Sequence, residues 1–300
     1  MNIDRPYFGR VVTAMVTPFK ANGDLDYDCA ANLAKYLVAN GSDGLVVSGT
    51  TGESATLNAD EKVRLFEVVK NAVGGQAKVL GGTGSYSTAD TIVLTRAAQD
   101  IGLDGALIVT PYYNKPSQAG MYEHFKTIAD STDIPIVLYN VPGRTGINLE
   151  VQTVAALSSI RNIIALKEAS KDVQQIGEIA ASVAPNFQIY SGDDAATLPI
   201  LSLGGVGVIS VISHLVGKDL QAMHTSFFKG DLPASQAVHL KSLALTRAMF
   251  AGPSPVPTKT ALAMLRILPN DTVRLPLIEA TESERAVVLS AIQRYGLSAV

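Results

Sequence analysis

The eight residues Ile163–Ser170, with the sequence IIALKEAS, decide how the rest of the chain is interpreted. Four apolar residues followed by Lys167 predict a buried strand that ends in an amine. Burial disfavours the charged form of a lysine, so an amine at this place can act as a nucleophile toward a carbonyl carbon. A structural role is the alternative, because Lys167 could reach solvent at the strand end or pair with Glu168.

Short apolar and β-branched runs recur along the chain and alternate with longer stretches of helical pattern. Eight strand–helix units within about 230 residues favour an α/β fold of the closed (β/α)8 TIM-barrel type over an open doubly wound sheet. The glycine motifs GxGxxG and GxxxxGK[ST], which would favour a nucleotide-binding open sheet, do not occur in the sequence. The predicted strands are Val11–Val16, Gly44–Val47, Lys78–Gly81, Gly105–Val109, Ile134–Tyr139, Ile163–Lys167, Gln188–Tyr190 and Val206–Ser210.

After the eighth predicted strand the pattern is helical only, which predicts a C-terminal three-helix extension. We therefore expect a catalytic barrel over residues 1–230 and a helical extension over 231–300 that serves as an appendage or a subunit contact. Thr281 and Glu284 form a capping box at the start of the last helix, as Asn58 does with the third residue after it at an earlier one. The predicted C-terminal helices are Pro233–Phe250, Pro257–Leu268 and Glu282–Tyr295.

The composition is that of an ordinary globular chain, with 47% hydrophobic and 17% charged residues. A net charge of −3 gives no reason to expect nucleic acid or an anionic membrane as a partner. The only cysteine, Cys29, excludes an intrachain disulfide, and the first ten residues lack the apolar core of a signal peptide. We therefore expect a soluble, cytoplasmic protein. We expect no metal either, because four histidines lack metal-ligand spacing: His124, His214, His224 and His239.

The residues that follow each strand are the ones to examine, because the reactive face of such a barrel lies at the carboxyl ends of its strands. The second strand is followed by Gly49–Ser54, in which two glycines let the backbone approach a ligand and successive N–H groups can bind an anion. A carboxylate would suit this loop. A plain tight turn whose hydroxyl groups cap the next helix is the alternative.

Tyrosine, arginine and glycine follow the later strands. Tyr112–Tyr113 comes after the fourth strand and Tyr139 ends the fifth, where a phenol can transfer protons. Arg144, on the loop that follows, can hold a carboxylate through a bidentate pair. Padding of the barrel rim and a solvated loop are the structural alternatives. The glycines of Ser191–Asp194 and Gly204–Ser210 either bind phosphate or leave room beside the lysine.

With these motifs in this order, the chain resembles the pyruvate-dependent class I lyase family of (β/α)8 barrels over essentially its whole length. The resemblance implies a Schiff base between Lys167 and pyruvate, whose enamine attacks L-aspartate 4-semialdehyde in the diaminopimelate route of lysine biosynthesis. It also implies that no metal or dissociable organic cofactor is needed, because the lysine is the electron sink. The motifs that carry the resemblance are Gly49–Ser54, Tyr112–Tyr113, Tyr139–Gly146, Lys167 and Ser191–Asp194.

The resemblance further implies a role for individual residues. Thr50, Tyr113 and Tyr139 would match a proton relay, with Tyr113 reaching into the active site of a neighbouring subunit. A homotetramer built from two tight dimers is the assembly that the resemblance implies.

The remaining implied roles concern substrate binding. Thr50 and Thr51 would bind the carboxylate of pyruvate, while Arg144 would bind the carboxylate of the semialdehyde. Gly192 and Ile209 would line the pyruvate pocket through their backbone groups.

The sequence departs from the family at a regulatory position. Feedback-inhibited members carry two histidines where this chain has Ala59 and Lys62, and asparagine and glutamate where it has Tyr86 and Asp90. We therefore expect weak or absent inhibition by lysine.

Two rival functions remain at this point. A sister lyase, such as an N-acetylneuraminate lyase or a 2-keto-3-deoxy sugar acid aldolase or dehydratase, would share Lys167 and Tyr139. Arg144 favours the semialdehyde, since neuraminate lyases lack that arginine, although a sugar acid dehydratase could tolerate it. The other rival is a non-catalytic barrel, which would have no need for a buried nucleophile with its desolvation cost.

Overall fold

The computed structural model describes residues 6–298. Its eight strands close into a barrel in sequence order, and every strand pair that the register describes is parallel. Each strand overlaps its predicted run, which confirms the (β/α)8 barrel. The strands are β1 (Val11–Ala14), β2 (Gly44–Val47), β3 (Lys78–Gly82), β4 (Gly105–Val109), β5 (Ile136–Asn140), β6 (Ile163–Glu168), β7 (Gln188–Ser191) and β8 (Gly207–Ser210).

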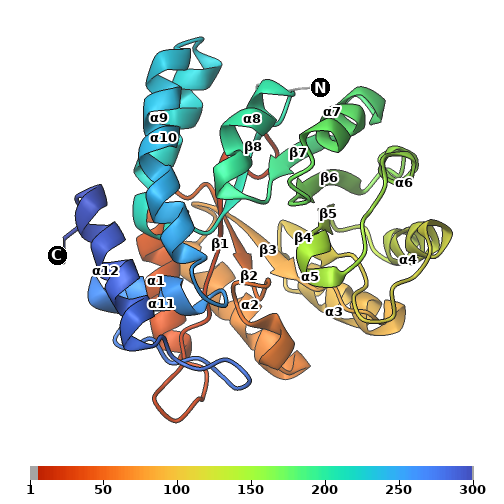
Figure 1. Cartoon of the computed structure of the whole chain (residues 1–300). Helices are drawn as coiled ribbons and strands as arrows, with labels where there is room; N and C mark the ends of the chain where they lie inside the picture. The colour runs from red at the N-terminus through yellow and green to blue at the C-terminus, as the bar shows by residue number, and fades with distance from the viewer. Residues whose placement is uncertain (1–5, 299–300) are drawn as a thin grey trace. The chain divides into compact units, whose positions relative to one another are not determined.

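The described chain divides into two compact units. Unit 1 comprises residues 6–10 and 78–209, and unit 2 comprises residues 11–77 and 210–298. In unit 1 the strands β4 to β6 are apolar along most of their length, and β4 to β7 are almost entirely buried, as expected of parallel strands covered on both faces. Figure 1 shows its longer helices outside these strands. They are α3 (Thr88–Asp100), α4 (Gln118–Asp130), α6 (Val151–Leu157), α7 (Val173–Ser182) and α8 (Thr197–Ser202).

Unit 2 holds β1, β2 and the helices at both ends of the chain. In Figure 1 the C-terminal helices pack on one another, α9 on α10 and both α10 and α11 on α12. Both predicted capping boxes form, at Asn58 with Glu61 and at Thr281 with Glu284. The helices are α1 (Tyr27–Ala39), α2 (Ala59–Val73), α9 (Ser213–Phe228), α10 (Leu232–Met249), α11 (Val256–Met264) and α12 (Glu282–Tyr295).

One C-terminal helix ends well before its predicted end. The helix α11 ends at Met264, whereas the apolar pattern predicts an end at Leu268. Arg266 adopts a left-handed conformation with φ of 57°, and the amides of Ile267 and Leu268 turn back to the carbonyl of Leu262. A left-handed residue closes a helix in this way. The position is hard to foresee because glycine, not arginine, is its usual occupant.

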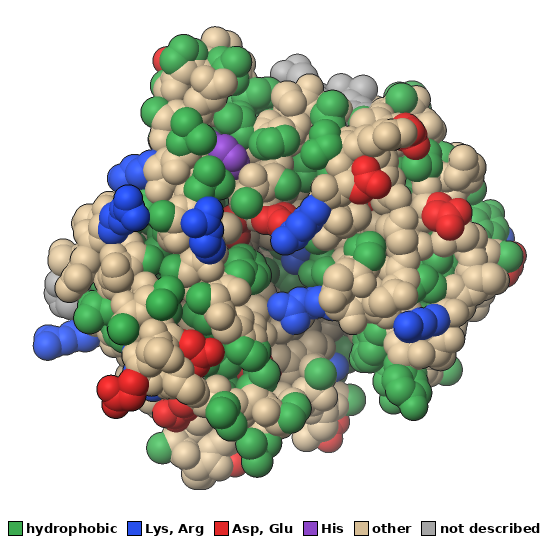
Figure 2. Space-filling model, in the orientation of Figure 1, with side chains coloured by type: hydrophobic (Ala, Val, Ile, Leu, Met, Phe, Trp, Pro, Cys, Tyr) green, Lys and Arg blue, Asp and Glu red, His purple; other side chains and the backbone are tan. Residues whose placement is uncertain are grey.

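Two further features concern the surface and the length of the helices. On the face in Figure 2, acidic and basic side chains both occur among a larger number of apolar and neutral ones. None of the helices within residues 6–298 combines the length and the apolar composition that crossing a lipid bilayer requires.

The fully buried His214 of unit 2 gives the fold a dependence on pH. The amide of Val16 donates to its Nε2 (3.1 Å), and its Nδ1 lies 2.7 Å from the carbonyl oxygen of Val211, to which Nδ1–H donates. Protonation of Nε2 would place its new N–H opposite the amide N–H of Val16, so that two donors would face each other. Burial accordingly lowers the pKa of His214 to about 4.

We expect acidification from pH 7 to pH 5 to lower the free energy of unfolding by about 2 kcal/mol through His214 alone. Between pH 6.5 and 4 the unfolded chain binds a proton that the folded chain does not, so stability falls as pH falls. Denaturant unfolding at both pH values measures this difference. The variant His214→Gln should show a smaller loss on acidification, while His124, whose pKa burial also lowers to about 4, supplies a remaining part. An unchanged slope in the variant would contradict the assignment.

Candidate active site

Lys167 lies where the sequence predicts it, near the carboxyl end of a buried strand in unit 1. Its side chain is almost fully buried, with 5% of the residue exposed. The register of β5 and β6 places Tyr139 directly beside Lys167. The amine nitrogen Nζ lies 4.2 Å from the centroid of the Tyr139 ring. The structure therefore brings the predicted nucleophile and one predicted proton-transfer group into contact.

Glu168 does not serve as the ion-pair partner that the structural alternative requires. Its side chain, on the opposite face of β6, accepts hydrogen bonds from Nδ2 of Asn140 (3.1 and 3.3 Å) and from the amide of Ser170 (2.6 Å). Burial raises the pKa of the Glu168 carboxyl, and these hydrogen bonds oppose the rise.

The same network extends to the loop that carries the predicted arginine. Asn140 donates to Oδ1 of Asn148 (2.9 Å) and accepts from the amide of Leu149 (3.0 Å). The network thus joins the ends of β5 and β6 to the loop that follows β5. Sequence reasoning missed Asn140 and Glu168, although each directly follows a predicted site residue.

Gly192, just after β7, leaves room for the lysine. A Cβ atom there would lie 3.0 Å from Cγ of Lys167 and 2.9 Å from Cβ of Ala169, which is too close for an ordinary contact. Its amide donates to the carbonyl of Glu168 (2.7 Å). The nearby Ile209 lies in β8 with 2% of its surface exposed. Of the two interpretations of the glycines, space beside the lysine is the one that fits Gly192.

Two predicted residues of unit 1 lie on the surface. Arg144 is exposed on the short helix α5 (Pro142–Thr145), whose amide hydrogen bonds with Val141 and Pro142 fix the backbone of the loop. Tyr113 is 90% exposed and has a left-handed backbone with φ of 69°. Its neighbour Tyr112 packs edge to face on Tyr86, with ring centroids 5.4 Å apart. The Tyr113 ring therefore projects away from its own chain.

Thr50 and Thr51 lie in unit 2, at the centre of a tight turn after β2. The amide of Gly52 donates to the carbonyl of Gly49 (3.0 Å), and the amide of Glu53 donates to the carbonyl of Thr50 (3.1 Å). The hydroxyl of Thr17 donates to the carbonyl of Gly52 (2.7 Å). The backbone of the turn is therefore fixed from within and from the end of β1.

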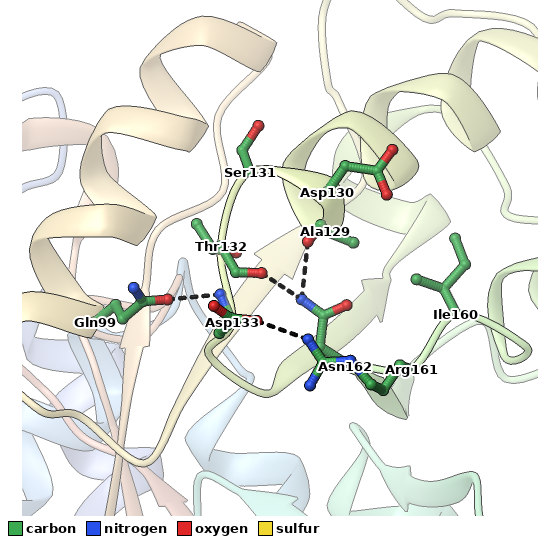
Figure 3. A pocket seen from close by; sticks show the side chains of 9 residues that line it. All are labelled: Gln99, Ala129, Asp130, Ser131, Thr132, Asp133, Ile160, Arg161 and Asn162. Atoms are coloured by element: carbon green, nitrogen blue, oxygen red, sulfur yellow. Dashed lines mark hydrogen bonds and ion pairs between the residues drawn. The ribbon is translucent and has the colours of Figure 1, made fainter.

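A polar hollow of about 490 Å³ lies elsewhere in unit 1, next to the segments that lead into β5 and β6. Figure 3 shows that several of its polar side chains form hydrogen bonds or ion pairs with other residues that line the hollow. Nδ2 of Asn162 donates to the carbonyls of Ala129 and Thr132, and Oε1 of Gln99 accepts from the amide of Asp133. The amino-terminal end of such a barrel serves stability, so we assign this hollow a structural role.

The histidines lie in helices, as the sequence predicts: His124 in α4, His214 and His224 in α9, and His239 in α10. Within the described part of the chain, no group of three or more His, Cys, Asp or Glu side chains could hold a metal ion.

A closed parallel barrel with a buried lysine beside a tyrosine at the carboxyl ends of adjacent strands defines the class of Schiff-base-forming barrel lyases. The chain matches the model of the dihydrodipicolinate synthetase family over residues 7–295, and it belongs to that family.

Individual relatives agree with this assignment. A 4-hydroxy-tetrahydrodipicolinate synthase from Moorella thermoacetica is 51% identical over 97% of this chain and 99% of its own. The crystal structure of the dihydrodipicolinate synthase from Cyanidioschyzon merolae with lysine bound is 46% identical, with a TM-score of 0.96 over 98% of this chain and 100% of that one. A solved structure described as the first monomeric dihydrodipicolinate synthase variant is 40% identical, with a TM-score of 0.94 over 97% and 98% of the two chains.

Proposed function

We propose that this protein catalyses the reaction of 4-hydroxy-tetrahydrodipicolinate synthases, the condensation of pyruvate with L-aspartate 4-semialdehyde. The observation that carries the proposal is the buried Lys167 amine against the Tyr139 ring, in a chain about half identical to named synthases. Relatives with this name favour the synthase over the sister lyases that the sequence left open.

The reaction follows from the chemistry of the amine. Nζ of Lys167 attacks the ketone carbon of pyruvate and water leaves, which gives a Schiff base. Loss of a methyl proton gives an enamine, whose carbon bonds to the aldehyde carbon of the semialdehyde. The amino group of the semialdehyde then attacks the former ketone carbon, closes the ring and releases Lys167. The protonated nitrogen accepts the electron pair when the methyl proton leaves, and it returns the pair when the new carbon–carbon bond forms and the aldehyde oxygen takes up a proton to become a hydroxyl. The lysine therefore supplies what a cofactor would otherwise provide.

The proton transfers need hydroxyl groups close to the reacting carbon. Tyr139 is the proposed acid and base, because its ring contacts the amine. Thr50 and Tyr113 are its proposed partners in a relay. The 90% exposure of Tyr113 is what a group that serves a neighbouring subunit needs, and it supports at least a dimer.

The binding residues divide between the two substrates. Thr50 and Thr51 are proposed to bind the pyruvate carboxylate on their fixed turn. Gly192 and Ile209 are proposed to contact pyruvate through their backbone groups. Arg144 is proposed to bind the carboxylate of the semialdehyde, since its guanidinium is exposed for a bidentate pair.

We expect Arg144→Ala to raise the KM for the semialdehyde by about 10- to 100-fold, the usual weight of a charge-assisted pair. Steady-state kinetics with each substrate varied in turn measure the effect, and the KM for pyruvate should stay within about twofold. Arg161→Ala is the matched control. Arg161 is an exposed arginine of the same unit that lies just before β6 and pairs with Asp133. Equal effects of the two substitutions would contradict the role of Arg144.

The assembly, the cellular location and the division of the chain are proposed on the same basis. A cytoplasmic homotetramer, made of two tight dimers with the catalytic barrel in residues 1–230 and the extension in 231–300, would bring Tyr113 to a second copy. Sedimentation velocity measures the assembly. A fully active monomer, like the form named for one structural relative, would exclude the role of Tyr113 in a neighbouring site.

We expect millimolar L-lysine, on the order of ordinary metabolite levels, to leave most of the activity intact. Ala59 and Lys62 lie on the first turn of α2. Tyr86 lies just before α3, and Asp90 lies on the first turn of α3. None of the four has the side chain that the family uses at its regulatory position. Initial rates at increasing lysine concentration measure the response, and strong suppression would contradict the expectation.

Pyruvate consumption with L-aspartate 4-semialdehyde, compared with N-acetylmannosamine as acceptor, tests the proposed function. We expect turnover with the semialdehyde only. Turnover with the sugar would place the protein among the sister lyases, and no turnover with either would favour the non-catalytic barrel.

A further inference from the structure

Unit 2 contains a buried ion pair that the proposed reaction does not use. Nζ of Lys259, from α11, lies 2.5 Å from Oε1 of Glu53, and both side chains are 1% exposed. Burial lowers the pKa of Lys259, and the charge of Glu53 opposes the shift. Removing two charges from water is costly, so a buried ion pair is weak evidence for stability, and a positional role is the hypothesis that its contacts have to support.

Glu53 occupies the corner of the turn that holds Thr50 and Thr51. Its backbone is left-handed, with φ of 56° and ψ of 37°. This conformation is unfavourable for a residue other than glycine, and it persists only where the surroundings enforce it. The amide of Glu53 closes the turn onto the carbonyl of Thr50 (3.1 Å). A shift of the Glu53 corner would therefore move the threonines.

The segment after α11 holds the same carboxylate at its second oxygen. Oε2 of Glu53 accepts a hydrogen bond from the backbone amide of Arg274 (3.1 Å). Lys259 in turn donates to the carbonyl of Thr272 (2.8 Å), and its Nζ lies 4.1 Å from the centroid of the Phe19 ring. The two oxygens of the Glu53 carboxylate are thus contacted by two residues of the C-terminal part of the chain, Oε1 by Lys259 and Oε2 by the amide of Arg274.

The guanidinium of Arg274 forms hydrogen bonds with the segment that follows the turn. It donates to the carbonyl of Thr56 (2.9 Å) and forms a bidentate pair with Glu61 on the first turn of α2 (2.6 and 2.9 Å). It also donates to the carbonyl of Gly23 (2.8 Å). The turn is therefore held at its corner by Lys259 and just beyond it by Arg274.

We propose that Lys259 is a positioning residue, which sets the carboxylate-binding turn through Glu53 although it does not touch substrate. The inference rests on the proposed role of Thr50 and Thr51. It gives the C-terminal helices a part in pyruvate affinity, beyond packing.

The test is Lys259→Met, which keeps the length of the side chain and removes the charge. The pyruvate concentration that half-saturates borohydride trapping at Lys167 should rise by about tenfold or more, since small misplacements of a binding group cost this much. The KM for the semialdehyde should stay within about twofold. Amide hydrogen exchange across residues 49–56 in the absence of pyruvate should become faster, because the corner is no longer held.

Two variants separate positioning from stability. Glu53→Gln with Lys259→Met removes both charges, so it leaves no unpaired charge and should fold more stably than the single variant. It should still bind pyruvate weakly, because the link to the corner is lost. Val288→Ala in the buried face of α12 destabilises the same unit without touching the turn, and it should bind pyruvate as the unchanged protein does.

Unchanged half-saturation and unchanged exchange over residues 49–56 in both Lys259 variants would overturn the inference. Failure of the unchanged protein to form an adduct would overturn the proposed function instead. The exchange measurement would then still decide whether the C-terminal segment fixes the turn, since it needs no substrate.

Discussion

Replacement of Lys167 by alanine is expected to lower kcat/KM by at least about 10³-fold, because no other group in the proposed reaction can form the Schiff base. Borohydride with pyruvate should label the unchanged protein at Lys167 and leave the variant unlabelled. The mass of the reduced peptide measures both outcomes. The loss should appear in the chemical step even at saturating pyruvate.

Lys62→Ala is the matched control for this substitution. Lys62 is a half-buried lysine whose pKa is lowered by burial, but it lies on α2 rather than beside Tyr139. Its variant should keep both the adduct and the activity. An adduct in the Lys167 variant, or residual condensation above a tenth of the original rate, would show that another nucleophile forms the intermediate.

The strands and the predicted nucleophile are accessible from sequence for a physical reason. Residues 163–167 form a continuous apolar run with one amine at its end, and a parallel strand covered on both faces produces that pattern locally. The barrel order makes β5 and β6 neighbours, but the register that sets Tyr139 beside Lys167 shifts between Ile136 and Val137 and is known only from the structure. Local periodicity and barrel topology together locate these two residues on neighbouring strands.

The supporting contacts are not accessible in this way. The carboxylate of Glu53 contacts Lys259 and the amide of Arg274. Glu53 and Arg274 are separated by 221 positions in the chain. No periodic pattern links such residues. The early end of α11 depends on a left-handed arginine, and the orientation of Tyr113 depends on a positive φ, neither of which the residue type predicts.

Tyr139→Phe is expected to lower kcat by about 10²- to 10⁴-fold, the usual contribution of a positioned acid and base. The substitution removes one oxygen and keeps the ring over Nζ of Lys167, so the packing of the amine should persist. Adduct formation with pyruvate should become slow but still go to completion. Rapid mixing followed by borohydride quench measures the rate and the final amount separately.

Tyr190→Phe is the matched control for this substitution. It also removes one phenolic oxygen, from the residue of β7 that lies beside Lys167 in the register of β6 and β7. The hydroxyl of Tyr190 accepts a hydrogen bond from the amide of Phe8 (3.2 Å), so its loss leaves a buried donor unsatisfied and should cost about 1 to 3 kcal/mol of stability. Its kcat should change by no more than a few-fold. If both variants lost activity alike, the effect of Tyr139 would be one of packing, and the proton transfer would belong to another group. If only Tyr139→Phe loses turnover while its adduct still forms, the phenol acts on the proton and not on the position of the lysine.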